Sequence, residues 1–427
     1  MNTLDVGREL SKHFDAATLS RGRPRFDLDE IPLVAPDSIP GFVEAIRFAA
    51  REKLCLVPTG LGSKLGWCAP PTRADFMLST RRFTGAVSHV PDDGTIAVRA
   101  GTTMAELSRI VESGGHRLTP DVPRPERCTI GGVVAAGESG ADRLRFGPVR
   151  HHVLGLKVLL ADGTIAKCGG QLVKNVTGFD LMKLYTGSHG TLCVILEVAL
   201  RLFPAPEREL FLASTDAPFE SAQRALALPL RLASLSVVSP NHLLEHYERE
   251  WSVFARLFGR GEAVEAERKA LLDAWPTSAV LESAEARAQA DAMRDLGCEA
   301  AHLPWFQASC RPAQINDVLF NANYVFRTFE SSESVGVVMP AAVQPGIATV
   351  SLQLCGSVTQ LATRTRWLRD QLKRIGADVA LLNAPSSELA YIDPLGDEPI
   401  GLDLMRDLKH ALDPNGVFAS GRFVGGM

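Results

Sequence analysis

Residues 128–140 have the sequence CTIGGVVAAGESG, in which small side chains fill nearly every position. Glycine and alanine leave the backbone uncovered, so such a segment lets the chain pack closely against a large, flat ligand. Taken alone, the same composition is equally consistent with a tight contact between a helix and a sheet. Two further glycine segments of the chain decide between these interpretations.

The first of these segments lies upstream, at residues 58–64, with the sequence PTGLGSK. It directly follows Leu54–Val57, a short apolar run of the kind that forms a buried strand. Glycines in such a turn let consecutive backbone N–H groups approach a phosphate, while Ser63 and Lys64 add a hydroxyl donor and a positive charge. The spacing fits neither a Walker loop nor a GxGxxG motif, and on its own the segment is more often an ordinary turn.

The remaining segment lies downstream and has two parts, GGQLVKNVTGFDL at residues 169–181 and LYTGSHGTL at residues 184–192. Lys174, Asn175 and Asp180 interrupt a region that otherwise has a buried character. Buried polar groups are hydrogen-bonded, so these side chains are expected to contact either backbone or ligand.

The order and spacing of the three segments resemble the flavin-binding domain of the vanillyl-alcohol oxidase/para-cresol methylhydroxylase (PCMH) superfamily, and within it the glycolate oxidase GlcE-type subunits. Val149-Arg150 and Val153-Leu154-Gly155 lie between the segments as the resemblance requires. It covers about residues 27–205 and returns at residues 408–418, followed by Gly421-Arg422. The resemblance implies an α+β fold, with a two-subdomain FAD-binding domain of PCMH type and a C-terminal α+β cap domain.

The resemblance also implies non-covalently bound FAD and the residues that contact it. The first pyrophosphate loop would be formed by Pro58, Thr59, Gly60, Leu61, Gly62, Ser63 and Lys64. A second contact, with the diphosphate and the ribityl chain, would be formed by Thr129, Ile130, Gly131, Gly132 and Ala135. Pro120 and Asp121 would lie near the isoalloxazine, and Gly190, Thr191 and Ile195 near the adenine. The block that contains Lys174, Asn175 and Asp180 would be an internal scaffold.

Several positions depart from the family pattern. Phe179 replaces a Tyr, His151 replaces the Asp that commonly follows the Arg, and Ala419 replaces the Asn of the C-terminal motif. The change at Ala419 removes a polar contact that the resemblance places near the flavin. No His lies in or beside the first loop, so a histidyl-linked flavin is not expected, and Cys128 is interpreted as a small core thiol rather than an attachment point.

Composition and charge exclude several other classes of protein. The 427 residues are 46% hydrophobic and 22% charged, as in ordinary globular proteins. A net charge of −4 makes nucleic acid an unexpected partner. The eight cysteines form no CxxC pair, so neither zinc nor an iron–sulfur cluster is predicted and no metal site is expected. Without a signal peptide or an apolar run of about 20 residues, the expected location is the cytoplasm, with membrane contact only through partners.

The patterns along the chain suggest four parts. These are an N-terminal lead-in (1–26), the FAD-binding domain (27–205), the α+β cap domain (206–400) and a C-terminal segment that returns to the flavin domain (401–427). Pro204 and Pro206 mark the main boundary. The arginines at positions 21, 23 and 25 are interpreted as part of a solvated lead-in. Helical patterns in the cap domain include residues 242–257.

The catalytic residues are harder to identify from the sequence. The related GlcD-type subunits carry a His-x-Gly-Asp-Gly-Asn-x-His-like metal motif, and this chain has none. His242 and His246 are spaced to share one helix face, which is interpreted as polar surface rather than a metal site. Arg311 is a candidate for holding a substrate carboxylate through a bidentate contact, with a structural ion pair as the alternative.

These observations leave two hypotheses of equal weight. In one, the chain is an FAD-dependent subunit that oxidises a small 2-hydroxy acid such as glycolate and passes electrons to an iron–sulfur partner. In the other, it is a non-catalytic FAD-binding assembly or electron-relay subunit of the same complex. The resemblance implies a GlcD-like flavoprotein and a GlcF-like iron–sulfur protein as partners. A stand-alone sugar or polyol oxidase is disfavoured, because such enzymes usually carry a histidine-linked flavin.

Overall fold

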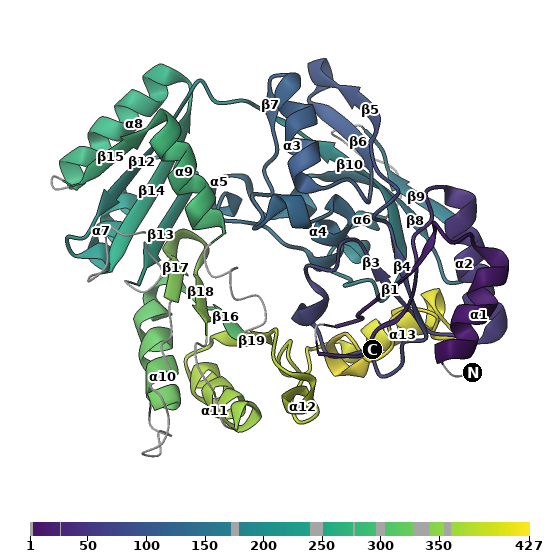
Figure 1. Ribbon diagram of the computed structural model, residues 1–427. Coiled ribbons are helices and arrows are strands. Elements are labelled where there is room, and N and C mark those ends of the chain that lie inside the picture. The colour runs from purple at the N-terminus through teal and green to yellow at the C-terminus, as the bar shows by residue number, and fades with distance from the viewer. Residues whose placement is uncertain are drawn as a thin grey trace. The chain divides into compact units, whose positions relative to one another are not determined.

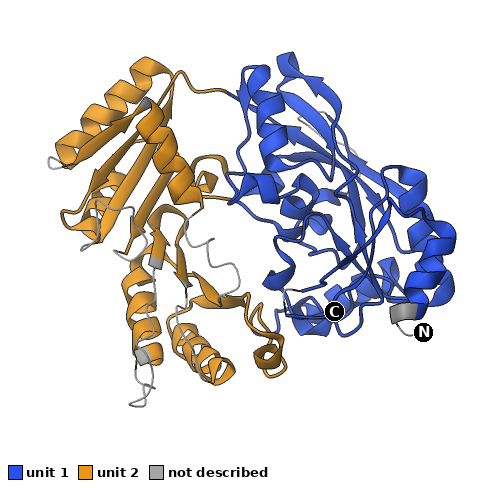
Figure 2. Ribbon diagram, in the orientation of Figure 1, with its two compact units in different colours: residues 1–139, 148–204, 397–427 blue, residues 140–147, 205–396 orange. Residues whose placement is uncertain are grey.

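The computed structural model describes residues 3–25, 27–171, 179–239, 251–275, 278–295, 304–327, 341–353 and 360–427. The chain divides into two units (Figure 2). Unit 1 comprises Met1–Ser139, Pro148–Pro204 and Asp397–Met427, and unit 2 comprises Gly140–Gly147 and Ala205–Gly396. The division after Pro204 adjoins the boundary expected at Pro204 and Pro206. The excursion of residues 140–147 into unit 2 has no counterpart in the sequence analysis.

The first sheet of unit 1 has four strands in the order β1-β2-β4-β3. They are β1 (Leu19–Gly22), β2 (Ile31–Val34), β4 (Phe76–Ser79) and β3 (Leu56–Thr59). Strands β2 and β3 both run parallel to β4, whereas β1 pairs antiparallel with β2. Helices α1 (Thr3–His13) and α2 (Ile39–Glu52) pack on this sheet (Figure 1). Helix α2 buries Phe42, Ala45, Ile46 and Ala49, a stripe at helical spacing, and Pro40 occupies its first turn.

The N-terminal residues belong to this sheet, so the interpretation of a solvated lead-in is wrong for part of residues 1–26. Helix α1 buries Val6 and Leu10, and β1 adds an edge strand. Arg25 is fully buried, where its Nη1 donates to the Cys68 carbonyl at 2.6 Å and its Nε lies 3.0 Å from Asp27 Oδ1. A buried guanidinium needs such partners, and the sequence alone does not show them.

The second sheet of unit 1 has five strands in the order β5-β6-β10-β8-β9, all paired antiparallel. They are β5 (Ala86–Val90), β6 (Thr95–Arg99), β10 (Val194–Arg201), β8 (Val153–Leu159) and β9 (Ile165–Gly169). Against it pack α3 (Met104–Ser113), α4 (Ile130–Ala136) and α6 (Met182–Tyr185). Strand β10 faces two cores, because Val194 and Leu196 join the core of the first sheet while Ile195 and Leu200 join the core of the second.

Three further elements complete unit 1. Strands β7 (His116–Arg117) and β11 (Phe203–Pro204) form a short antiparallel ribbon. Helix α13 (Leu402–Leu412) precedes a C-terminal turn that contains Val417. The carbonyl of Val417 accepts a hydrogen bond from the backbone N–H of Leu56 on β3 at 2.8 Å. This returns the C-terminal residues to the first sheet. Lys409 reinforces the return, since its Nζ lies 3.0 Å from the carbonyl oxygen of Phe418.

Unit 2 is built on one eight-stranded sheet with the order β15-β12-β14-β13-β17-β18-β16-β19. The strands are β15 (Ala279–Glu282), β12 (Arg208–Ser214), β14 (Ser252–Gly259), β13 (Ser234–Val238), β17 (Ala341–Gln344), β18 (Thr349–Gln353), β16 (Trp305–Ser309) and β19 (Asp378–Leu382). The helices are α5 (Arg143–Phe146), α7 (Pro218–Ala227), α8 (Gly261–Ala274), α9 (Ser283–Arg294), α10 (Ile315–Arg327), α11 (Leu361–Arg374) and α12 (Ser386–Leu389).

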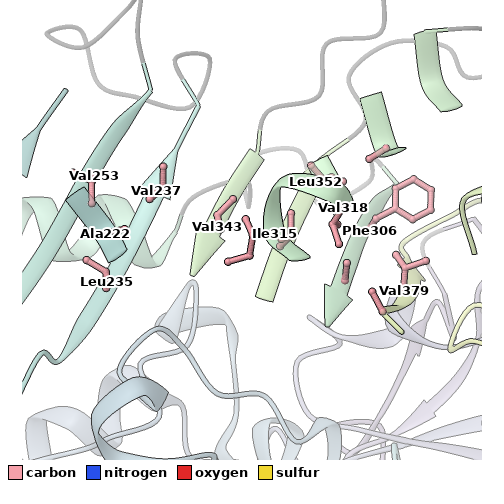
Figure 3. Packing of buried hydrophobic residues seen from close by; sticks show 14 of the residues in the cluster. Ala222, Leu235, Val237, Val253, Phe306, Ile315, Val318, Val343, Leu352 and Val379 are labelled. Carbon is pink, nitrogen blue, oxygen red and sulfur yellow. The ribbon is translucent and has the colours of Figure 1, made fainter. Parts of the chain in front are cut away.

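Both faces of this sheet carry a hydrophobic core. Along β12, Leu210 and Leu212 face the larger core, which α7, α8, α10 and α11 cover, and part of which Figure 3 shows. Phe211 and Ala213 point to the opposite face, which α9 covers. Each fully buried Leu or Phe contributes about 1.5–3 kcal/mol relative to exposure, so this alternation stabilises both layers.

The helix predicted at residues 242–257 is wrong over its described part. Ser252–Gly259 is strand β14, which pairs with β12 and β13 in the middle of the sheet. Because helices cover both faces of the sheet, every residue from 252 to 258 is buried and the strand shows no alternation. Apolar residues fall at both odd and even positions of this segment, with Arg256 among them, so its sequence has no period that separates a strand from a buried helix.

Residues 140–147 are tied to the sheet of unit 2 by a buried ion pair. The Asp142 carboxylate is fully buried and lies 3.0 Å from Nη1 of Arg256 on β14, and Glu209 on β12 lies 2.6 Å from the same guanidinium. Arg145 lies over the ring of Phe258, 4.9 Å from its centroid. These contacts explain why a segment between two parts of unit 1 belongs to unit 2.

Replacing Asp142 should therefore destabilise unit 2. In Asp142→Asn the buried Arg256 loses one of its two carboxylates, and we expect a loss of about 1.5–3 kcal/mol in the free energy of unfolding. The control is Glu9→Gln in the exposed Lys12–Glu9 pair, for which a change below about 0.5 kcal/mol is expected. Urea unfolding of the full chain measures both. Equal midpoints for the two variants would contradict a stabilising role of Asp142.

Candidate functional site

A pocket in unit 1 gathers residues from all three glycine segments and from the C-terminal turn. It encloses about 680 Å³ of empty space, part of which is open solvent. Its lining consists of Pro58, Thr59, Gly60, Leu61, Gly62, Ser63, Lys64, Leu65, Thr80, Thr129, Gly131, Gly132, Ala135, Ala136, His189, Gly190, Cys193, Val194, Ile195 and Arg422. Segments that are far apart in the sequence therefore surround one space.

Most of the residues predicted to contact FAD line this pocket. They include the whole first loop, the second-loop residues Thr129, Gly131, Gly132 and Ala135, and the third-segment residues Gly190 and Ile195. Ile130 instead points into the hydrophobic core, and the Thr191 hydroxyl donates to the Ser188 carbonyl at 2.7 Å. Pro120 and Asp121 also lie outside the lining, so their place beside the isoalloxazine stays a prediction.

The first loop presents its backbone to the pocket. It leaves β3 after Thr59 and turns at Gly62, whose φ of +84° is a conformation that glycine adopts without strain. The Ser79 hydroxyl anchors the loop by donating to the Gly60 carbonyl at 2.8 Å. Within the described part of the chain, the backbone N–H groups of residues 60–63 donate to no acceptor. Successive free N–H groups in a turn form an anion-binding concavity.

The second loop contacts the first at Gly60. A Cβ on Gly60 would lie 2.0 Å from Thr129 Oγ1, so only glycine allows the two loops to approach this closely. Thr129 is also the N-cap of α4, where its Oγ1 accepts from the Gly132 N–H at 3.2 Å. On the other side of α4, a Cβ on Gly131 would lie 2.7 Å from the Cβ of Ala100. The small residues thus serve close packing as well as an open pocket wall.

The third segment closes the pocket at His189 and Gly190. His189 has a φ of +53° and donates its backbone N–H to the Ala135 carbonyl at 2.8 Å, which ties the segment to the end of α4. A Cβ on Gly190 would lie 3.4 Å from the ring of Pro58 in the first loop. The three segments are therefore in mutual contact and form one structure.

Lys64 was expected to contact the cofactor, and its Nζ already has partners in the protein. It lies 2.7 Å from Glu138 Oε2, 3.0 Å from Cys128 Sγ and 3.2 Å from Ser63 Oγ. Burial is the largest single influence and lowers the pKa of Lys64, but the interactions with Glu138 and Cys128 together outweigh it and raise that pKa. Cys128 is buried and its thiol donates to the Pro123 carbonyl at 3.1 Å, in agreement with a core position.

Sequence reasoning did not assign Arg422 and His189 to the site. Arg422 was part of the C-terminal resemblance, but nothing in the sequence placed it beside the first loop. Its Nη2 donates to the Leu65 carbonyl at 3.1 Å, directly after that loop. The pKa of His189 falls to about 4, because the imidazole is buried and lies near the charge of Arg422. His189 is therefore uncharged near neutral pH.

Other residues singled out in the sequence lie elsewhere. Phe179 is 91% exposed, and the carboxylate of Asp180 pairs with Lys183 at 2.9 Å on the surface. Arg311 is an exposed residue of unit 2, whose backbone N–H donates to Gln314 Oε1. Lys174, Asn175, His242 and His246 lie outside the described residues. Among the residues that are described, no group of three or more His, Cys, Asp or Glu side chains could hold a metal ion.

The chemistry of the pocket fits a flavin dinucleotide. The free N–H groups of residues 60–63 suit a diphosphate, and Arg422 supplies a buried positive charge beside them. Gly60 and Gly131 keep side chains out of the wall, where a Cβ would collide with neighbouring atoms. No helix within the described ranges is both long and apolar enough to cross a bilayer.

Comparison with known proteins identifies the domain. Residues 32–169 match the family described as FAD binding domain, so this chain carries an FAD-binding domain, as predicted. Its fold matches that of p-cresol methylhydroxylase over 98% of this chain and 96% of that one, with a TM-score of 0.71 and 14% sequence identity. The predicted α+β class, with an FAD-binding and a cap domain, is thereby confirmed.

The names of three curated relatives refer to the oxidation of 2-hydroxy acids, namely glycolate and D-lactate. Over 171 residues the chain is 34% identical to the glycolate oxidase subunit GlcE of Escherichia coli (strain K12), which covers 40% of this chain and 48% of that protein. It is 28% identical over 259 residues to the glycolate oxidase subunit GlcD of Bacillus subtilis (strain 168), covering 57% and 55%. It is 35% identical over 192 residues to the D-lactate dehydrogenase of Archaeoglobus fulgidus (strain ATCC 49558), covering 42% of each. The chain thus spans about half the length of the curated relatives it matches.

The contact of Gly60 with Thr129 makes Gly60 indispensable. We expect Gly60→Val to abolish flavin retention, because the new side chain would push the two loops apart. The flavin content of the purified protein, read from its visible spectrum, measures this effect. The matched control is Gly170→Val, since a Cβ on Gly170 would meet no atom of the described residues within 4 Å. A folded Gly60→Val protein with full flavin occupancy would overturn the assignment of the first loop.

Burial of His189 should make the protein less stable in acid. Its pKa of about 4 lies below the ordinary 6.5, so the unfolded chain binds a proton more readily than the folded protein. Stability is therefore fully present above about pH 6.5 and is lost as the pH falls towards 4, by up to about 3 kcal/mol. In His189→Asn, which suits a positive φ, this part of the pH dependence should vanish.

Urea unfolding across this pH range tests the role of His189. The control is His151→Asn, since His151 is exposed in the same unit. If the free energy of unfolding of His189→Asn fell with pH as steeply as that of the wild type, His189 would not be the group responsible.

Proposed function

We propose that this chain is an FAD-dependent oxidoreductase that oxidises a small 2-hydroxy acid, as a subunit of a glycolate oxidase-like complex. The observation that carries the proposal is the convergence of the three glycine segments on one pocket of an FAD-binding domain. The names of the relatives support the substrate class, since they include glycolate oxidase subunits and a D-lactate dehydrogenase.

In this proposal the residues of unit 1 hold the cofactor in place. The free N–H groups of residues 60–63 bind its diphosphate end. Gly60, Gly131 and Gly132 keep side chains out of the pocket wall and so leave room for the cofactor. His189, which also lines the pocket, stays uncharged. Pro120 and Asp121 remain our candidates for the isoalloxazine end, and Thr191 for a supporting role at the adenine end through Ser188.

The chemistry requires a hydride acceptor and a proton acceptor. Oxidation of a 2-hydroxy acid removes a hydride from the α-carbon and a proton from the hydroxyl group, and yields a 2-oxo acid. FAD, when bound, supplies the hydride acceptor, and the protein supplies orientation and charge. Arg311 remains a candidate for the substrate carboxylate, since it is exposed in unit 2 and a guanidinium can form a bidentate contact.

The proposed partners are a GlcD-like flavoprotein and a GlcF-like iron–sulfur protein. Two of the relatives are named as subunits of glycolate oxidase, which supports a complex. In the proposal the electrons leave the reduced cofactor for the iron–sulfur partner. A membrane would be reached only through these partners.

The test is flavin reduction in the chain purified alone. We expect a visible flavin spectrum that bleaches under anaerobic conditions with glycolate or D-lactate, and does not bleach with L-lactate. A flavin that stays oxidised with all three would contradict catalysis by this chain and favour the assembly or electron-relay role. A colourless folded protein that takes up no added FAD would contradict the cofactor assignment for this chain in isolation.

A further inference from the structure

Two cationic side chains border the pocket, and they differ in what they already contact. Lys64 belongs to the first loop, and Arg422 to the C-terminal turn. The sequence pattern favours Lys64 as the residue that meets the cofactor's phosphates. The contacts of the two side chains favour Arg422.

Lys64 is committed to a carboxylate. Its side chain and that of Glu138 are each only 10% exposed, and their charged atoms are 2.7 Å apart. If Lys64 turned towards a phosphate, the Glu138 carboxylate would remain buried without its partner, which is strongly unfavourable. Burial also raises the pKa of Glu138, against the opposing effect of Lys64. The pair therefore adds almost no net charge to the pocket.

Arg422 has unused hydrogen-bonding capacity. It is 2% exposed, its Nη2 donates to the Leu65 carbonyl and the Cys68 side chain lies beside its guanidinium, but Nε and Nη1 have no hydrogen-bond acceptor within bonding distance among the described residues. No carboxylate of the described residues lies within ion-pair distance of it. Burial lowers the pKa of Arg422, yet arginine keeps its proton in proteins. A buried, unpaired guanidinium is costly and calls for an anion.

We propose that Arg422, and not Lys64, supplies the positive charge that binds the diphosphate of FAD. This inference rests on the proposed function, because it concerns the same pocket. The Arg422 contact with Leu65 places the guanidinium next to the loop whose N–H groups at residues 60–63 are free. A guanidinium presents parallel donors that match two oxygens of a phosphate, and the N–H groups add further donors to the same anion.

The test compares ligands that contain a diphosphate with one that does not. The full chain, freed of flavin, is titrated calorimetrically with FAD, with ADP and with riboflavin. We expect Arg422→Gln to weaken FAD and ADP binding by about 10–100-fold, as for loss of charge-assisted hydrogen bonds, and to change riboflavin binding by less than about threefold. Arg422→Lys keeps the positive charge but not the parallel donors of the guanidinium, and should give an intermediate loss of FAD and ADP affinity.

Two controls separate this effect from a general loss of charge. Arg81→Gln removes an exposed arginine of the same unit. The double variant Lys64→Met with Glu138→Gln removes the buried pair without leaving a lone carboxylate, and we expect it to weaken FAD binding by less than about threefold. Thermal unfolding verifies that each variant is folded, and if Arg422→Gln is not, Arg422→Lys carries the comparison.

The outcomes distinguish the two proposals. If the wild type binds neither FAD nor ADP, the proposed function fails. If the wild type binds FAD while Arg422→Gln binds it equally well, or weakens riboflavin as much as FAD, this inference is overturned. A larger loss in the Lys64 and Glu138 double variant than in Arg422→Gln would assign the charge to Lys64 instead. Unchanged FAD binding with weakened glycolate binding in Arg422→Gln would assign Arg422 to a substrate carboxylate.

Discussion

The approach of Gly60 to Thr129 is the contact on which the candidate site depends. Thr129 Oγ1 occupies the space that a Cβ of Gly60 would fill, and the same atom caps the first turn of α4. Gly131, the second residue of that helix, packs against Ala100. One threonine thus joins the loop of the first sheet to the helix that rests on the second. The space left between them is shaped by backbone, which explains why the pocket can present N–H groups rather than side chains.

Most of the ionisable side chains around this space are either paired with an opposite charge or uncharged. Lys64 and Glu138 neutralise each other, and His189 stays uncharged because it is buried near Arg422. The positive charge of Arg422 is therefore not cancelled by a carboxylate of the described residues. Because Arg422 itself is buried, its charge acts at short range and with little screening. A dinucleotide carries negative charge only at its diphosphate, so a single cation beside free N–H groups also sets which part of the ligand lies there.

The glycine segments could be predicted because glycine encodes backbone geometry directly in the sequence. Arg422 could not, since its position depends on the C-terminal turn returning to β3, which is a tertiary contact. The same reason explains Arg25, which was expected in solvent and is buried against Cys68. Strand β14 was taken for a helix because helices cover both faces of its sheet and erase the alternation. Residues 140–147 join unit 2 through the buried Asp142–Arg256 pair. The two residues are far apart in the sequence, so no local sequence pattern predicts this contact.

Sequence similarity and fold similarity extend over different parts of the chain. The family match ends at residue 169, within unit 1, whereas the fold match at 14% identity extends over 98% of the chain. A cofactor pocket made by close backbone contacts tolerates few side chains at positions such as Gly60, so its sequence signal is strong. A sheet with a core on each face needs only apolar residues of suitable size, so unit 2 can keep its fold while its sequence changes. Its exposed side chains, Arg311 among them, lie outside that core.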